Sequence, residues 1–155
     1  MLKILGIVFL FISQVAWAAS STLSCVPLSL KAQNKTITLP GVEDPHTTQI
    51  YFLQNISQQS LWIDHPTAGK SVSAGWSSYL HPQKWSAILI NRKNFVLNCA
   101  VIQPGKVDYL NCAKSVKVCV ASKTVFHSKR KGSYWLAEDK EWTELLVALE
   151  KRGME

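Results

Sequence analysis

The stretch FVLNCAVIQPGKVDYLNCAK, from Phe95 to Lys114, carries the tetrapeptide Leu-Asn-Cys-Ala twice. Pro104-Gly105 lies between the two copies and is typical of a tight turn, so the stretch predicts a β-hairpin. In one register Cys99 faces Leu110, and Cys112 lies diagonal to it. A register shifted by two residues places Cys99 opposite Cys112. Both registers put the two cysteines on the same face of the sheet, because side chains alternate with a period of two.

The spacing of the cysteines does not fit the usual metal and redox motifs. A zinc site groups its ligands as C-x(2–4)-C pairs, and a thiol redox centre uses C-x-x-C. Neither spacing occurs among the four cysteines, which are Cys25, Cys99, Cys112 and Cys119. We therefore expect structural disulfides, with no metal and no cofactor. Three pairings are open, and the hairpin favours Cys99–Cys112, which leaves Cys25–Cys119 to tie the N-terminal strand to the core.

Residues 1–18 have the layout of a secretory signal peptide. Lys3 precedes the apolar run Ile4–Ile12, and Ala16-Trp17-Ala18 is a small-x-small cleavage site. We expect cleavage after Ala18 and a periplasmic or secreted protein, a location in which disulfides form. No other long apolar run follows, so we expect no transmembrane segment in the mature chain.

Residues 19–155 are expected to form one β-rich domain. Short segments of alternating hydrophobicity recur at intervals of about 8–12 residues, which predicts an antiparallel sandwich or barrel-like domain. Within it, Gln49–Ile56 and Leu61–Asp64 are expected to pair as a hairpin, and His65–Gly75 to form a loop. Val107–Ala113 is expected to be the second strand of the hairpin that carries Cys112.

The C-terminal segment has the periodicity of an amphipathic helix over about 139–152. Its apolar positions recur at i, i+3, i+4 and i+7, at Trp142, Leu145, Leu146 and Leu149. Asp139 is placed to cap the helix N-terminus, and Gly153 follows as a C-terminal cap.

The chain has a net charge of +7, and its densest basic run contains Lys129, Arg130 and Lys131. Such a segment suits lipopolysaccharide, another anionic glycan or an acidic partner protein. The simpler interpretation is a solvated loop that keeps the domain soluble. Nucleic acid is not an expected partner, because export separates the protein from it and no nucleic-acid motif is present.

The aromatic residues of Trp62–Trp85 suggest a second candidate surface, suited to a sugar or a peptide. Trp76 follows Gly75 in a segment with the composition of a loop, where an exposed aromatic ring suits a partner contact. We therefore predict a contact surface in the loop that contains Trp76, Tyr79 and His81, with segment 123–131 second. The alternative is that these large aromatic side chains fill the core.

The sequence carries no catalytic signature. No serine lies in a nucleophile elbow, and no glycine-rich phosphate loop is present. Asp64-His65 suggests a catalytic dyad, but neighbouring residues on a strand point to opposite faces. We therefore expect a non-enzymatic protein.

Four segments together resemble a known family. They are SAGWSSYL at Ser73–Leu80, WSAILI at Trp85–Ile90, the cysteine run at Leu97–Cys119, and YWLAEDKEWTELLVALEKRG at Tyr134–Gly153. The resemblance is to the small exported "enhanced entry" proteins (EnhB type) of intracellular gamma-proteobacterial pathogens. It implies a periplasmic or envelope protein associated with host-cell entry or intracellular growth. We expect the partner to be an envelope or host protein. It supplies no catalytic residues.

Overall fold

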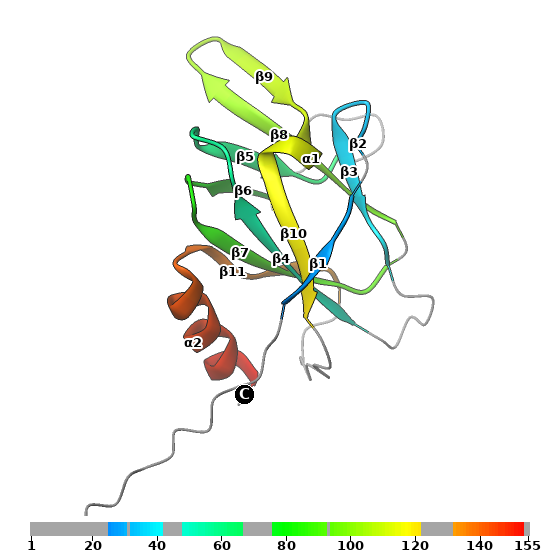
Figure 1. Ribbon diagram of the computed structural model, residues 1–155, viewed down its shortest axis with the longest axis vertical. Coiled ribbons are helices and arrows are strands. Elements are labelled where there is room, and N and C mark those ends of the chain that lie inside the picture. The colour runs from blue at the N-terminus through cyan, green and yellow to red at the C-terminus, as the bar shows by residue number, and fades with distance from the viewer. Residues whose placement is uncertain are drawn as a thin grey trace, which may run out of the picture.

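The computed structural model describes residues 25–30, 32–41, 48–66, 76–92, 94–121 and 132–153. Two antiparallel sheets form the body of the protein, and a helix follows the last strand (Figure 1). The predicted mainly β fold with a C-terminal helix and two disulfides is therefore confirmed. The predicted signal peptide lies outside the described residues. No helix in the described part of the chain is long and apolar enough to span a membrane.

The first sheet has five strands in the order β1-β10-β4-β7-β11. These are β1 (Cys25–Leu28), β10 (Val116–Ala121), β4 (Gln49–Asn55), β7 (Trp85–Ile90) and β11 (Tyr134–Lys140). The central strands β4 and β7 are almost continuously apolar and buried, as expected for strands covered on both faces.

The second sheet has the order β2-β3-β8-β5-β6, and β9 pairs with the far end of β8. Its strands are β2 (Ala32–Gln33), β3 (Thr36–Leu39), β8 (Phe95–Gln103), β5 (Leu61–Asp64), β6 (Ser77–Leu80) and β9 (Lys106–Leu110). The β8–β9 hairpin projects from the body of the sandwich at the top of Figure 1.

Alternation along the strands divides the core into two clusters. On β4, Tyr51 and Leu53 point into the cluster between the sheets, where they meet Ile63 and Leu97 of the second sheet. Phe52 belongs to a separate cluster on the opposite face of the first sheet. The first sheet is therefore buried on both faces, whereas the second sheet contributes its inner face alone.

Helix α2 (Trp142–Gly153) closes the outer face of the first sheet. Leu145 and Leu149 are buried there, and Trp142 packs edge-on against Phe52 at 5.3 Å between ring centroids. The predicted start of this helix is wrong, because Asp139 lies inside β11 at φ +50°. Residue Glu141 precedes the helix instead, and its N–H donates to the Glu144 carboxylate at 3.3 Å, one half of a capping box.

The predicted β4–β5 hairpin is wrong, because the two strands belong to different sheets. Asn55 is fully buried at the corner between them, and its Nδ2 donates to the carbonyls of Gln59 and Leu80 at 2.7 Å each. Its Oδ1 accepts from the Ser57 N–H at 2.9 Å. These bonds satisfy the Asn55 amide and fix a corner that carries the chain from one sheet to the other.

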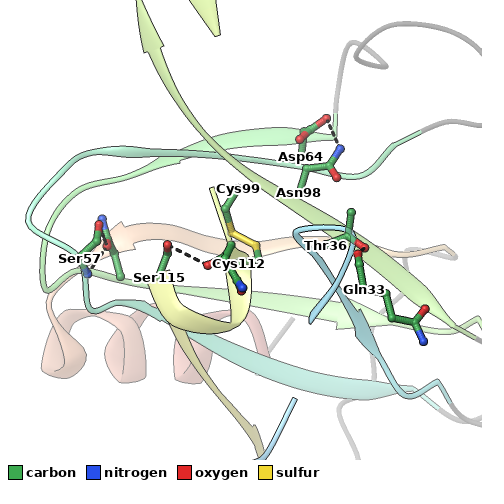
Figure 2. Close-up of a disulfide and its surroundings, with 10 residues drawn as sticks. Gln33, Thr36, Ser57, Asp64, Asn98, Cys99, Cys112 and Ser115 are labelled. Carbon is green, nitrogen blue, oxygen red and sulfur yellow. Dashed lines mark hydrogen bonds between the residues drawn. A yellow bond between two sulfur atoms is a disulfide. The ribbon is translucent and has the colours of Figure 1, made fainter. Parts of the chain in front are cut away.

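The hairpin that carries the repeated tetrapeptide is confirmed, in the register that places Cys99 opposite Leu110. The strand predicted over Val107–Ala113 is wrong at its end, since β9 stops at Leu110 and Cys112 begins the short helix α1 (Cys112–Ser115). That turn brings Cys112 back over Cys99, and their disulfide has a Cα–Cα distance of 5.1 Å (Figure 2).

The second disulfide joins Cys25 of β1 to Cys119 of β10, with a Cα–Cα distance of 5.3 Å. The favoured pairing is therefore confirmed in both of its bonds. Cys119 belongs to the cluster under helix α2, whereas Cys99 and Cys112 belong to the cluster between the sheets. Each core cluster thus contains one disulfide.

Candidate functional site

The outer face of the second sheet presents a continuous apolar surface. Trp62 of β5 pairs with Tyr79 of β6 and with Ala100 of β8, and Ala100 pairs with Tyr109 of β9. Directly paired residues place their side chains on the same face. These four residues therefore form one row across the sheet, on the face opposite the core.

The next row on the same face is formed by Ile102 and Val107, which pair near the tip of the β8–β9 hairpin. We define the outer patch as Trp62, Tyr79, Ile102, Val107 and Tyr109. The exposed fractions are 47% for Tyr79, 43% for Ile102, 51% for Val107 and 47% for Tyr109. Ala100 beneath them is fully buried. The patch is apolar, contiguous and without a charged side chain, which distinguishes it from a scatter of exposed apolar residues.

Two contacts position parts of the outer patch. The Trp62 and Tyr79 rings meet edge to face, with 4.7 Å between their centroids. The Tyr109 carbonyl accepts a hydrogen bond from Lys35 Nζ at 2.9 Å, which fixes the end of β9 against the β2–β3 turn. The patch thus lies on paired strands and needs little ordering to bind a partner.

A buried acid lies beside the outer patch on the same face. Asp64 follows Trp62 by two positions and faces Asn98 of β8. Asp64 is 4% exposed, and within the described chain its Oδ1 has no hydrogen-bond partner. Burial raises the pKa of the Asp64 carboxyl above its usual value, and a long 3.5 Å hydrogen bond from Asn98 offsets part of that rise (Figure 2).

A polar notch of about 390 Å³ opens where β8 changes partner from β3 to β9. The residues that line it include Asn34, Lys35, Asn98 and Tyr109. Two amides, one ammonium group and an exposed aromatic ring are groups that can hydrogen-bond and stack against a sugar. We refer to this feature as the polar notch.

The structure separates the aromatic residues predicted to act together. Ser77–Leu80 form β6, so the predicted loop over Trp76–His81 is wrong. Trp76 is half-buried and turns toward the core, with 4.6 Å between its ring and that of Phe95 and 5.8 Å to that of Trp135. Tyr79 points to the other face and belongs to the outer patch.

His81 has a structural partner. Its Nδ1 lies 2.6 Å from Asp139 Oδ2, and its backbone N–H donates to Asp139 Oδ1 at 2.8 Å. Asp139 reaches His81 because β11 is irregular there, and the Asp139 N–H donates to the buried Ser86 hydroxyl at 2.9 Å. His81 therefore ties the end of β6 to the edge of the first sheet.

Lys129, Arg130 and Lys131 lie outside the described residues, so the basic contact surface stays a prediction. The Asp64-His65 pair is split as expected. His65 stacks on Phe95 at 4.2 Å and places Nδ1 2.6 Å from the Val96 carbonyl, whereas Asp64 lies on the outer face.

Three members of the outer patch, Ile102, Val107 and Tyr109, were not predicted from the sequence, and Trp62 was predicted only as part of a longer aromatic run. A signal for these three was present in the hairpin. With Cys99 opposite Leu110, the residues Ile102, Val107 and Tyr109 must share the face that Cys99 does not use. Trp62 could not be added in this way, because its pairing with Ala100 joins segments that are distant in sequence.

Comparison of the chain with protein-family models, curated proteins and solved structures finds no match. The resemblance to the "enhanced entry" proteins therefore stays a prediction.

Proposed function

We propose that the protein is an exported, non-enzymatic protein of the cell envelope that acts through protein–protein contacts at the outer patch. The observation that carries this proposal is the contiguous, uncharged and largely exposed set of aromatic and aliphatic side chains on one sheet face. Two disulfides support an oxidising compartment, because such bonds are rare in proteins kept in the cytosol.

The composition of the outer patch favours a protein partner. Protein interfaces are enriched in tyrosine, tryptophan and aliphatic anchors at their centres and depleted of charge there. The patch combines Trp62, Tyr79 and Tyr109 with two aliphatic side chains on a rigid sheet. A link to host-cell invasion or intracellular growth, through an envelope or host protein, rests on the family resemblance alone.

Site-directed photocrosslinking in intact cells tests the proposal. A benzophenone amino acid in place of Tyr79 or Tyr109 should form a crosslinked product with a second protein. The matched control replaces Val147, which is comparably exposed but lies on the outer side of helix α2. We expect a discrete product from the outer patch and none from position 147. Equal products from both faces, or none from the patch, would contradict the proposal.

The polar notch supports a second candidate, an anionic glycan or lipopolysaccharide binder. Lys35 Nζ uses one hydrogen for the Tyr109 carbonyl and has others to offer an acidic sugar, beside the Asn34 and Asn98 amides. Binding of a soluble polyuronate should then weaken at least tenfold in Lys35→Gln and be lost in about 0.5 M salt. Lys151→Gln on α2 is the control, and replacing Lys129, Arg130 and Lys131 tests the predicted basic segment. Binding that is insensitive to salt argues against this candidate.

A further inference from the structure

Strand β9 (Lys106–Leu110) leaves one long edge without a strand partner among the described residues. It pairs with β8 alone, and Lys106, Val107 and Tyr109 are exposed. Strand β1 contains Pro27, the edge strand β11 is irregular, and the edge strand β2 has two residues. The edge strand β6 has four residues, and the His81–Asp139 contact ties its end to β11. Edge β9 is therefore the one best suited to accept another strand.

Hydrogen bonding to β8 alternates along β9, and this alternation identifies the backbone groups that face away from β8. The turn Pro104-Gly105 is closed by the pair Gln103 and Lys106, which is hydrogen-bonded in a two-residue hairpin. Bonding then alternates, so Val107 and Tyr109 direct their N–H and C=O groups away from β8. The hydrogen bond that the Tyr109 carbonyl accepts from Lys35 at 2.9 Å agrees with this alternation. Val107 has both groups free among the described residues.

The charges beside Val107 are self-complementary. Lys106 and Asp108 flank it on the opposite face of the strand, and their side chains form an ion pair at 2.7 Å within one copy. In a two-fold symmetric interface both copies use the same surface. If residue i of one copy contacts residue j of the other, then residue j of the first copy contacts residue i of the second. Lys-Val-Asp satisfies this requirement when two such strands run antiparallel about the central valine.

We propose that the protein self-associates by antiparallel pairing of two β9 strands, centred on Val107. The N–H and C=O of each Val107 would bond those of the partner's Val107. Lys106 would then lie opposite the partner's Asp108, and Asp108 opposite the partner's Lys106. Cross-strand pairs of opposite charge stabilise such a ladder, and the two outer patches become one continuous face.

The neighbouring registers are less favourable. Centring on Asp108 places two carboxylates directly opposite each other, which is repulsive. Centring on Tyr109 requires its carbonyl, which already accepts the hydrogen bond from Lys35. The register about Val107 avoids the repulsion between carboxylates and places Tyr109 at the end of the ladder, opposite the partner's Gly105, instead of at its centre. A single pair of edge strands buries less area than stable dimers do, so we expect reversible self-association with a dissociation constant between about 10 µM and 1 mM.

Sedimentation velocity of the oxidised, exported chain at up to about 1 mM tests this inference. Wild type should shift reversibly from monomer to dimer with concentration. Lys106→Asp alone and Asp108→Lys alone should each weaken dimerisation at least tenfold. The double exchange of both residues should restore it, because opposite charges again face each other. Val107→Pro should abolish the dimer while sparing the hairpin, since the lost N–H does not bond β8.

Wild type that stays monomeric across this range would overturn the inference. So would single charge reversals that dimerise like wild type, or a double exchange that fails to restore the dimer while its circular dichroism and melting temperature match those of wild type. The inference is independent of the proposed function: a crosslinked product of twice the chain mass reports self-association, whereas a product of any other mass reports a different partner.

Discussion

The two sheets of this protein bury their outer faces to very different extents. Helix α2 covers the first sheet and buries Leu145 and Leu149 against it. No described element covers the equivalent face of the second sheet, where Tyr79, Ile102, Val107 and Tyr109 remain exposed. The same alternation of side chains therefore produces a closed core on one side and an open apolar surface on the other.

This difference separates residues required for the fold from residues available for binding. A strand that faces water usually carries polar side chains on that face. The outer patch departs from this rule without any folding requirement, because the sandwich already has two core clusters and two disulfides. Departures of this kind are expected at functional surfaces.

The largest expected effect comes from the disulfide on the closed side. Replacing Cys25 and Cys119 with alanine opens a loop of 94 residues, whereas replacing Cys99 and Cys112 opens one of 13. Loop-closure entropy predicts losses of about 4 to 5 kcal/mol and about 3 kcal/mol respectively. Guanidinium unfolding of the two variants measures both values. A larger loss from the shorter loop would contradict this ranking.

A smaller effect distinguishes the two sides of helix α2. Leu145→Ala empties a fully buried position against the first sheet and should cost about 3 kcal/mol of unfolding free energy. Val147→Ala, on the exposed side of the same helix, should change it by less than about 0.5 kcal/mol. Denaturant titration of both variants provides the comparison. Similar losses would mean that α2 does not close the sheet as described.

Trp76 tests the boundary between core and contact surface. Its ring packs against Phe95 and Trp135 while remaining half-buried, so Trp76→Ala should cost about 2 kcal/mol. Thermal melts of this variant should therefore shift clearly, and crosslinking from position 79 should persist. An unchanged melting temperature would instead support the original expectation that Trp76 is a contact residue.

The smallest effect concerns Asp64, whose pKa is raised mainly by burial. A raised pKa means that the folded state binds the proton more tightly than the unfolded chain. This contribution to stability is therefore complete below the usual carboxyl pKa of about 4 and is lost as pH rises through the folded value. Asp64→Asn should be more stable than wild type at pH 7, and the difference should shrink toward pH 4. If the stability difference between Asp64→Asn and wild type grew on acidification, the pKa of Asp64 would not be raised in the folded state.

Local sequence signals predicted the features that depend on neighbouring residues. The Pro104-Gly105 turn and the strand alternation predicted the hairpin, and one of the two predicted registers is the observed one. Helical periodicity found α2, although the irregular end of β11 moved its start from Asp139 to Trp142. The spacing of the cysteines and the alternation of side chains along the hairpin together predicted both disulfides.

Features set by distant contacts could not be predicted in the same way. Gln49–Ile56 and Leu61–Asp64 looked like a hairpin, but the buried Asn55 amide turns the chain into the other sheet through bonds to Gln59 and Leu80. The serines around Tyr79 predict a loop, whereas pairing with β5 makes this segment strand β6. The outer patch depends on the same long-range pairings, which is why the sequence could not place Trp62 beside Tyr109 of the hairpin.

The most direct test of the outer patch combines stability and binding in one variant. Ile102→Ser with Val107→Ser removes its exposed aliphatic members, and position 79 carries the photocrosslinker. We predict that the unfolding free energy changes by less than about 1 kcal/mol, and that the crosslinked product is lost. A product that persists, or a variant that unfolds, would contradict the claim that the open sheet face binds a partner rather than supports the fold.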